Sequence, residues 1–289
     1  MNIKAGVRKF IKFILSCKPE KKVTANIFCL GQNELLEGKL ALVTGGTSGI
    51  GKSIAIAFLK AGADVVITGR TQAKIDAVVA DIRTSCPDRM LFGAVLDISN
   101  VSSLEESFSN ILAMVKMRNI DILVNSAGVS AAPQEDLLME EKGYESVMGT
   151  NLKGTYFLSK LVSKYMIEKH IEGNILNIAS TSSNRPATNA YSISKWGIKG
   201  LTIGLAKTLI PHNIVVNGIA PGPTVTPMMK QDGDTNLNLP NNPSRRFAMP
   251  EEIGSMAVVL TSGIGRLVVG DIVYMGGGPG VITVDDITY

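Results

Sequence analysis

Short apolar runs rich in β-branched residues alternate with longer stretches of helical periodicity from Lys39 onward, and this alternation limits the folds open to the chain. Alternating strands and helices predict a parallel sheet with crossover helices. The runs are almost continuously apolar, which is typical of strands that are covered on both faces. We therefore expect an α/β fold with a single doubly wound domain, in which a parallel sheet of seven strands carries helices on both faces.

The expected elements can be placed by residue number. The strands are expected at Leu40–Thr44, Asp64–Thr68, Leu91–Leu96, Ile122–Asn125, Asn174–Ile178, Val215–Ile219 and Asp271–Tyr274. The helices are expected at Gly51–Lys60, Gln72–Ser85, Val101–Met117, Glu141–Lys169, Tyr191–Leu209 and Glu251–Ser262. No internal repeat or linker divides this region, so we expect residues 37–289 to form one domain.

The N-terminal residues 1–36 form a separate, basic extension in this interpretation. Lys4, Arg8 and Lys9 lie among apolar side chains, which predicts a partly amphipathic helix or a disordered segment. Weak contact of residues 1–16 with a membrane surface is the alternative. The apolar stretch is short and is interrupted by Lys12, and no apolar run in the sequence is long enough to be a transmembrane segment.

Charge and cysteine content restrict the partners and the compartment. The formal net charge is +4, and no broad basic stripe indicates binding to nucleic acid. Cys17, Cys29 and Cys86 are odd in number and have no companion His cluster. We therefore expect no disulfide, no metal site and a reducing, cytoplasmic compartment.

The first turn from strand to helix, Thr44–Gly51, is rich in glycine. Such a turn lets the backbone approach a pyrophosphate that sits against the N-terminus of the next helix. The overlapping segment Gly46–Ser53 also reads Gly-x-x-x-x-Gly-Lys-Ser, the phosphate loop of nucleoside triphosphatases. At this turn alone, a dinucleotide site and a triphosphatase site remain open.

Residues at the ends of the next strands favour a dinucleotide. Arg70 follows the second strand, where a site for NAD usually has an acidic residue and where an Arg suits a ribose 2′-phosphate. Asp97 and Ile98 end the third strand and are placed for an adenine edge. Small residues after the fourth strand, Asn125–Gly128, let a cofactor lie close to the backbone. NADP(H) is favoured and NAD(H) is the alternative.

Tyr191 and Lys195 are the candidates for chemistry. Four residues apart in a helix, their side chains lie on one face. A cation beside a phenol favours the phenolate, so we expect Lys195 to lower the pKa of Tyr191 and to suit it to general acid–base catalysis. Asn151, in the middle of an apolar helix, needs a hydrogen-bond partner.

Together these motifs resemble the short-chain dehydrogenase/reductase family of the compact, single-domain type, with a Rossmann fold. The resemblance runs from about Glu37 to Gly278 and rests on several spaced motifs: Thr44–Gly51, Asn125–Gly128, Asn151, Ser180, Tyr191-x-x-x-Lys195, Pro221-Gly222 and Thr226. It implies that Tyr191 exchanges a proton with the substrate and that Lys195 lowers the pKa of Tyr191 and holds the nicotinamide ribose. It also implies that Ser180 positions the substrate oxygen and that Asn151 supports a water. The implied cofactor contacts are Thr44, Gly45, Thr47, Ser48, Gly49, Ile50, Gly51, Arg70, Asp97, Ile98, Asn125, Ala127, Gly128, Tyr191, Lys195, Pro221, Gly222, Thr224 and Thr226.

Two departures from the family pattern stand out. Ser180 precedes Tyr191 by slightly fewer residues than is usual in the family, so Ser182, Ser183 and Thr181 compete for its role. Members that prefer NADP often carry a basic residue in the glycine turn, where this chain has Ser48.

The resemblance implies an NAD(P)(H)-dependent oxidoreductase, NADPH-preferring, that interconverts a secondary alcohol and a ketone. A 3-oxoacyl, a sugar-linked and another carbonyl substrate stay open. A polar wall favours a hydroxylated or anionic substrate and is formed by Asn184, Arg185, Thr188 and Asn189; that Arg185 is a solvated loop charge is the alternative. The alternatives are a non-catalytic nucleotide-sensing protein on the same fold and a P-loop NTPase. A homodimer or homotetramer is also implied, with the helices Glu141–Lys169 and Tyr191–Leu209 packing against their symmetry mates.

Overall fold

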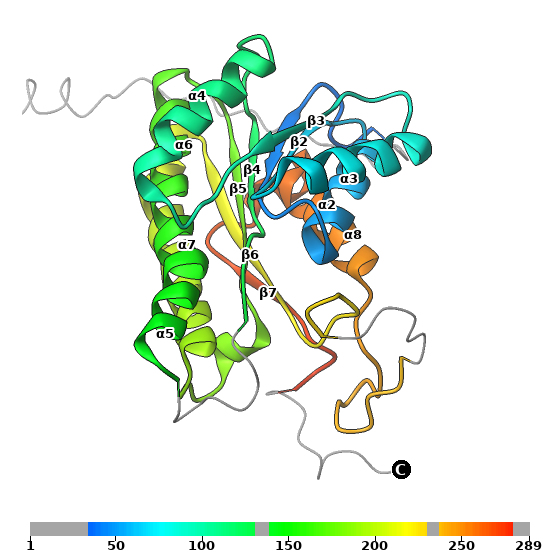
Figure 1. The fold of residues 1–289 in the computed structure, drawn as a ribbon, viewed down its shortest axis with the longest axis vertical. Helices are drawn as coiled ribbons and strands as arrows, with labels where there is room; N and C mark the ends of the chain where they lie inside the picture. Colours follow the sequence, from blue (N-terminus) through cyan, green and yellow to red (C-terminus); the bar gives the residue numbers. More distant parts are fainter. Residues whose placement is uncertain (1–33, 131–138, 230–236, 280–289) are drawn as a thin grey trace, which may run out of the picture.

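The computed structural model describes residues 34–130, 139–229 and 237–279, and in these ranges seven strands form one parallel sheet (Figure 1). The strand order is β3-β2-β1-β4-β5-β6-β7. The strands are β1 (Leu40–Val43), β2 (Asp64–Gly69), β3 (Leu91–Val95), β4 (Ile122–Asn125), β5 (Asn174–Ile178), β6 (Val215–Pro221) and β7 (Ile272–Met275). The expected seven-stranded, doubly wound α/β fold is confirmed. Because the order reverses between β1 and β4, a crevice opens there at the carboxyl ends of the strands.

Helices cover both faces of the sheet. On one face α2 (Gly49–Lys60), α3 (Gln72–Ser85) and α8 (Pro250–Thr261) contribute to a single apolar core with the strands. Figure 1 shows α4 (Leu104–Met114), α5 (Glu141–Met148), α6 (Thr155–Glu168) and α7 (Ala190–Leu209) on the opposite side. None of the helices within the described ranges combines the length and the hydropathy that a membrane span needs.

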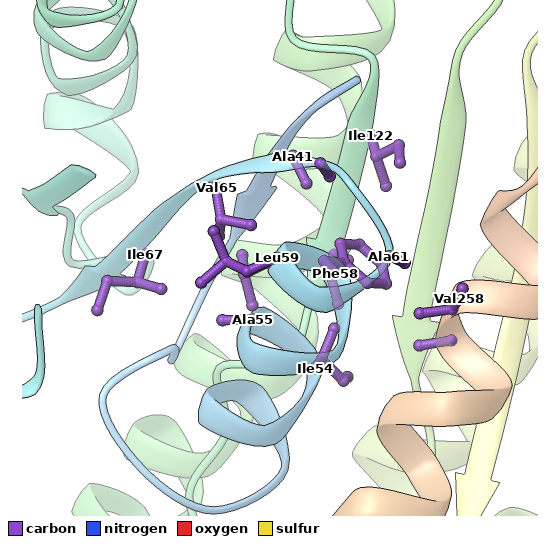
Figure 2. Packing of buried hydrophobic residues seen from close by; sticks show 14 of the residues in the cluster. Ala41, Ile54, Ala55, Phe58, Leu59, Ala61, Val65, Ile67, Ile122 and Val258 are labelled. Atoms are coloured by element: carbon purple, nitrogen blue, oxygen red, sulfur yellow. The ribbon is translucent and has the colours of Figure 1, made fainter. Parts of the chain in front are cut away.

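The packing of α2 fixes the glycine turn that precedes it. Phe58 and Ile54 of α2 are fully buried between the sheet and Val258 of α8 (Figure 2). Burying one such side chain contributes about 1.5–3 kcal/mol. Gly254 of α8 lets the two helices approach, because a Cβ there would lie 3.0 Å from the carbonyl oxygen of Ser53. The start of α2 is therefore held rigidly at the crevice.

One expected helix is wrong in detail. The stretch Glu141–Lys169 is divided by a π-helical segment, η2 (Gly149–Gly154), which contains Asn151. The Asn151 amide donates to the carbonyl oxygen of Val129 and accepts from its N–H, which fastens this turn to the segment after β4. Such π segments within helices occur frequently at functional sites.

The start of the folded region and the bounds of a second helix also differ from the expectation. Leu36, assigned by the sequence to the extension, is buried in the core, and its N–H donates to the carbonyl oxygen of Ala61. The predicted helix Val101–Met117 begins with a 3₁₀ turn at Val101–Ser103 and ends at Met114. The predicted basic helix of the extension and its contact with a membrane surface fall on residues 1–33, outside the described residues.

Candidate active site

A cleft of about 640 Å³ lies at the carboxyl ends of the strands. It is lined by the glycine turn before α2, by the segments after β2, β3, β4 and β5, and by the start of α7. Most of the residues expected at a cofactor line it. These are Gly45, Thr47, Ser48, Gly49, Ile50, Gly51, Arg70, Asp97, Ile98, Ala127, Gly128, Tyr191, Lys195, Pro221, Gly222, Thr224 and Thr226.

The glycine turn leaves backbone N–H groups free to bind an anion. Gly45 has a positive φ of 65°, and a Cβ there would lie 2.8 Å from Cα of Ala127. Ser48 is the N-cap residue of α2, yet its side chain makes no capping hydrogen bond. The first N–H groups of α2 therefore receive no capping bond from Ser48 and suit a phosphate group.

The phosphate-loop alternative does not fit this geometry. In that site the Lys side chain must reach the phosphates. Here Nζ of Lys52 pairs with Oδ2 of Asp81 on α3 at 2.6 Å. Within the described ranges, neither Lys52 nor Ser53 lines the cleft. The turn is thus arranged for a dinucleotide rather than for a magnesium nucleoside triphosphate.

Two residues expected at the cofactor lie behind the cleft instead. Oγ1 of Thr44 donates to the carbonyl oxygen of Val124 at 3.2 Å and accepts from the N–H of Ala127 at 3.1 Å. Nδ2 of Asn125 donates to Oδ1 of Asn177, in the neighbouring strand, at 2.8 Å. Both side chains are buried and fasten adjacent strand ends together. Their contribution to a cofactor site is indirect, through the position of the backbone.

Basic side chains gather where the ribose of a dinucleotide is expected. Arg70 follows β2, and Lys74 lies in the first turn of α3; both are exposed and line the cleft. Neither side chain forms an ion pair with another residue of the described ranges. Guanidinium and ammonium groups without a counter-charge suit a phosphate. Lys74 was not among the residues expected at the cofactor, although a second cation in the turn after Arg70 is a signal that the sequence contains.

The start of α7 brings Tyr191 and Lys195 together. Oδ1 of Asn189 accepts from the N–H of Ser192 at 2.8 Å and caps the helix. Nζ of Lys195 lies 5.6 Å from the ring centroid of Tyr191. It also donates to the carbonyl oxygen of Ile178 at 2.9 Å. The expected placement of phenol and ammonium on one helical face is present.

The pKa of Tyr191 shifts in the direction opposite to the expected one. Burial raises it, and a hydrogen bond with the Ser180 side chain acts against this rise. Burial also lowers the pKa of Lys195 to about 8. Desolvation disfavours both charged forms, and it outweighs the attraction that the sequence suggested. Tyr191 is therefore protonated near neutral pH and available as a proton donor.

Of the competing hydroxyl groups, Ser180 is the one beside Tyr191. The buried Ser183 donates to the carbonyl oxygen of Ser180 at 2.6 Å, so its role is to hold the loop. Ser182 lines the cleft, and its N–H donates to Oγ of Ser180 at 3.1 Å. Ser180 is itself buried at the N-terminus of the 3₁₀ turn Thr181–Asn184. The hydroxyl of Ser180 is thus held by the N–H of Ser182 and by the phenol of Tyr191.

Asn151 supports the site from behind. It is buried and does not line the cleft. Its Nδ2 donates to Oγ of Ser194 at 3.2 Å, and that hydroxyl donates to the carbonyl oxygen of Tyr191 at 2.6 Å. Ser194, which the sequence analysis missed, thereby joins the π-helical turn to the turn of α7 that carries Tyr191. The signal was present, because Ser194 directly precedes Lys195.

Comparison with known proteins agrees with this geometry. The sequence profile described as short chain dehydrogenase matches residues 39–237. A 3-oxoacyl-[acyl-carrier-protein] reductase FabG of Thermotoga maritima is 32% identical over 249 residues, which cover 84% of this chain and 98% of that protein. Two solved structures are also similar. A Brucella melitensis 3-ketoacyl-(acyl-carrier-protein) reductase complexed with NADH is 30% identical with a TM-score of 0.75, covering 86% of this chain and 100% of the other. A Burkholderia cenocepacia gluconate 5-dehydrogenase in complex with NADP and tartrate is 27% identical with a TM-score of 0.77, covering 87% and 99%. The chain belongs to the short-chain dehydrogenase/reductase family of oxidoreductases.

Proposed function

We propose that the protein is an NADPH-preferring reductase that interconverts a ketone and a secondary alcohol, with Tyr191 as the general acid. The observation that carries this proposal is the arrangement of the Tyr191 phenol, the Ser180 hydroxyl and the buried Lys195 ammonium on one wall of the cleft. When bound, the nicotinamide supplies the hydride. Tyr191 donates the proton to the substrate oxygen, Ser180 orients that oxygen, and Lys195 stabilises the phenolate that remains.

The residues present fit the cofactor. The uncapped start of α2 suits the pyrophosphate, and Asp97 and Ile98 line the part of the cleft that follows β3. Arg70 and Lys74 supply two positive charges for a 2′-phosphate and favour NADP(H) over NAD(H). The two similar structures described above hold NADH in one case and NADP in the other. Cofactor preference therefore rests on this chain's own basic residues.

The proposed substrate class rests on the relatives and on the residues that line the cleft. The similar proteins are named as 3-oxoacyl reductases and as a gluconate dehydrogenase. All of these names describe chemistry at a secondary alcohol or ketone. The cleft wall combines apolar Met228 and Met229 with polar Asn241 and Asn242. We infer a substrate with both polar and apolar parts.

The test is oxidation of NADPH over a panel of 3-oxoacyl thioesters, keto-sugars and aliphatic ketones. Tyr191→Phe should lower the turnover number about 10²–10⁴-fold, because general acid catalysis contributes this much. Its dissociation constant for NADPH should change little. Ser109→Ala, which removes an exposed hydroxyl group on α4, is the control and should behave as wild type. Retained turnover in Tyr191→Phe would refute the assigned proton donor. Binding of NADPH without turnover of any substrate would leave a nucleotide-sensing protein.

We also infer a homodimer or homotetramer. Tyr144, Tyr156, Phe157, Trp196 and Ile203 are large apolar side chains exposed on α5, α6 and α7. Exposed apolar surface of this kind marks association sites. A light-scattering mass equal to one chain at micromolar concentration would exclude this assembly. A cytoplasmic location is part of the same proposal, and cell fractionation tests it.

A further inference from the structure

The charged side chains that line the cleft are mostly basic. Among the described residues, the lining includes four cations and one acid: Arg70, Lys74, Arg185, Lys195 and Asp97. Arg70, Lys74 and Asp97 follow β2 and β3, on the side assigned to the cofactor ribose. Lys195 is buried at the catalytic pair. Arg185 is therefore the cation left over for a group that the cofactor does not supply.

The main chain of Arg185 is fastened to the helix that carries the catalytic pair. Its carbonyl oxygen accepts a hydrogen bond of 2.8 Å from Nε1 of Trp196, the residue after Lys195 in α7. Arg185 itself has an extended backbone directly after the 3₁₀ turn that begins next to Ser180. The base of its side chain is thus held at a fixed separation from Ser180 and Tyr191. A substrate bound in this way would therefore need a set spacing between the group that contacts Arg185 and the carbonyl that reacts at Ser180 and Tyr191.

The guanidinium of Arg185 has no acidic partner in the part of the chain that the structure describes. It is exposed toward the cleft, where it is not neutralised by a carboxylate. A guanidinium binds carboxylate and phosphate groups through two parallel hydrogen bonds, so such a position selects for an oxyanion. The same cleft is also lined by Met228, Met229 and Leu239, which offer apolar surface to the carbon chain of a substrate.

We propose that Arg185 binds an oxyanion on the substrate, so that the substrates are oxo-acids and hydroxy-acids or their phosphate counterparts. This inference rests on the proposed ketone reduction and names its substrate class. The carbonyl lies at Ser180 and Tyr191, and the carboxylate or phosphate lies at Arg185. Trp196 is a positioning residue in this arrangement, because its indole holds the main chain from which the guanidinium extends.

The test compares substrates that differ only in the anion. NADPH oxidation is measured with a series of oxo-carboxylates of increasing chain length, with their methyl esters, and with the corresponding phosphate esters of keto-alcohols. Wild-type protein should use one of the two anionic series at least about tenfold more efficiently than the neutral esters. Arg185→Gln should lower kcat/KM for that series about 10–100-fold, mainly through KM, and leave the esters unchanged. Which anionic series responds identifies the oxyanion as carboxylate or phosphate.

Matched variants separate binding from folding. Arg185→Lys keeps the charge but loses the paired donors, so its loss should be intermediate. Trp196→Phe should raise KM for the anionic series and leave the dissociation constant for NADPH unchanged. Lys207→Gln removes an exposed cation elsewhere on α7 and should behave as wild type. Equal losses with acids and esters in Arg185→Gln, or no loss with either, would overturn the inference.

Failure of the inference differs from failure of the proposed function. Reduction of neutral ketones with no preference for anions would leave the reductase proposal intact and remove the role of Arg185. If no ketone is reduced, binding of the oxo-carboxylates and keto-alcohol phosphates to the protein with NADPH is measured by fluorescence titration. Binding that Arg185→Gln abolishes would still support the oxyanion site. Absence of binding in the wild type would contradict it.

Discussion

Nζ of Lys195 donates a 2.9 Å hydrogen bond to the carbonyl oxygen of Ile178, the last residue of β5. Ser180 lies just beyond that strand end, and Tyr191 lies one turn before Lys195 in α7. This single bond therefore sets the helix against the strand that leads to the serine. The contact between α7 and β5 thus helps to position Ser180, Tyr191 and Lys195 relative to one another.

The buried ammonium predicts an unusual dependence of stability on pH. The pKa of Lys195 is lowered from 10.5 to about 8 in the folded protein. Between these two values the unfolded chain binds the extra proton, so the free energy of unfolding should rise with pH. The full difference is of the order of 3 kcal/mol. The raised pKa of Tyr191 acts in the opposite direction at higher pH, so the rise is best followed from about pH 8 to 10.

Lys195→Met provides the comparison, because it removes the ammonium and keeps an unbranched side chain. Urea unfolding at a series of pH values should show the rise in wild type and a flatter profile in Lys195→Met. Lys207→Met, which removes an exposed lysine of the same helix, should keep the wild-type slope. Parallel profiles for wild type and Lys195→Met would show that Lys195 is not desolvated in the folded protein.

The sequence was sufficient for the sheet and for most of the cleft. Strands covered on both faces are almost continuously apolar, so the runs Leu40–Val43 and Ile122–Val124 stood out from the helices. Ligands bind at the carboxyl ends of parallel strands, so the residues that follow each strand became candidates. This local rule placed Arg70, Asp97 and Ser180 at the cleft, where they are found.

What the sequence could not supply depends on contacts between distant segments. The π-helical turn at Asn151 is held by Val129, and no local propensity encodes that bond. The direction of the pKa shift of Tyr191 is set by burial, which only the packed structure determines. The position of Thr44 was also beyond local prediction. Thr44 belongs to the glycine-rich motif, but its side chain binds main-chain groups of Val124 and Ala127 behind the cleft.

The bonds of Asn151 predict a loss of stability together with a loss of activity. Asn151→Ala leaves both main-chain groups of Val129 without their side-chain partner, which should cost about 1–3 kcal/mol in the free energy of unfolding. Ser194→Ala removes the bond from Asn151 and the bond to the carbonyl oxygen of Tyr191, and should cost about 1–2 kcal/mol. Urea unfolding measures both values, and Asn110→Ala on the exposed side of α4 is the control.

Activity distinguishes positioning from packing in these two variants. Because Ser194 also binds the carbonyl oxygen of Tyr191, Ser194→Ala should lower kcat at a temperature where the variant is fully folded. KM for NADPH should stay near the wild-type value. Normal kcat in folded Ser194→Ala would show that Ser194 contributes to packing alone.

Arg70 and Lys74 predict the choice of cofactor. Arg70→Asp should weaken NADPH binding about 10–100-fold, because it removes a guanidinium from the 2′-phosphate and adds a repelling carboxylate. The same carboxylate can accept from a ribose 2′-hydroxyl, so NADH binding should improve. Lys74→Gln should weaken NADPH binding by a smaller factor and leave NADH unchanged. Dissociation constants from fluorescence titration check this, with Lys60→Gln at the end of α2 as control. If the ratio of the dissociation constants for NADPH and NADH is unchanged in Arg70→Asp, residues other than Arg70 determine the cofactor preference.

The start of α8, which follows the segment bordering the cleft, predicts an acid-sensitive contribution to stability. Glu252 accepts two hydrogen bonds from the Arg246 guanidinium, at 2.6 and 2.8 Å, and one of 2.8 Å from the N–H of Met249. Its bonds with Arg246, and then with Met249, lower the pKa of Glu252 to about 2. An acid with a depressed pKa stabilises the folded state above its ordinary pKa of 4.5, and this stabilisation is lost as the pH falls toward 2.

Glu252→Gln should therefore lower the free energy of unfolding by about 1 kcal/mol at neutral pH, a value kept small by the solvent exposure of the pair. The difference between wild type and Glu252→Gln should shrink as the pH is lowered from about 5 to 2, because the wild-type carboxylate then becomes protonated. Glu251→Gln is the matched control, since Glu251 is the exposed neighbour in the same helical turn and has no partner for its carboxylate within the described ranges. Thermal unfolding over this pH range measures the effect. A difference that stays constant down to pH 2 would mean that the Gln side chain alters packing rather than the ion pair.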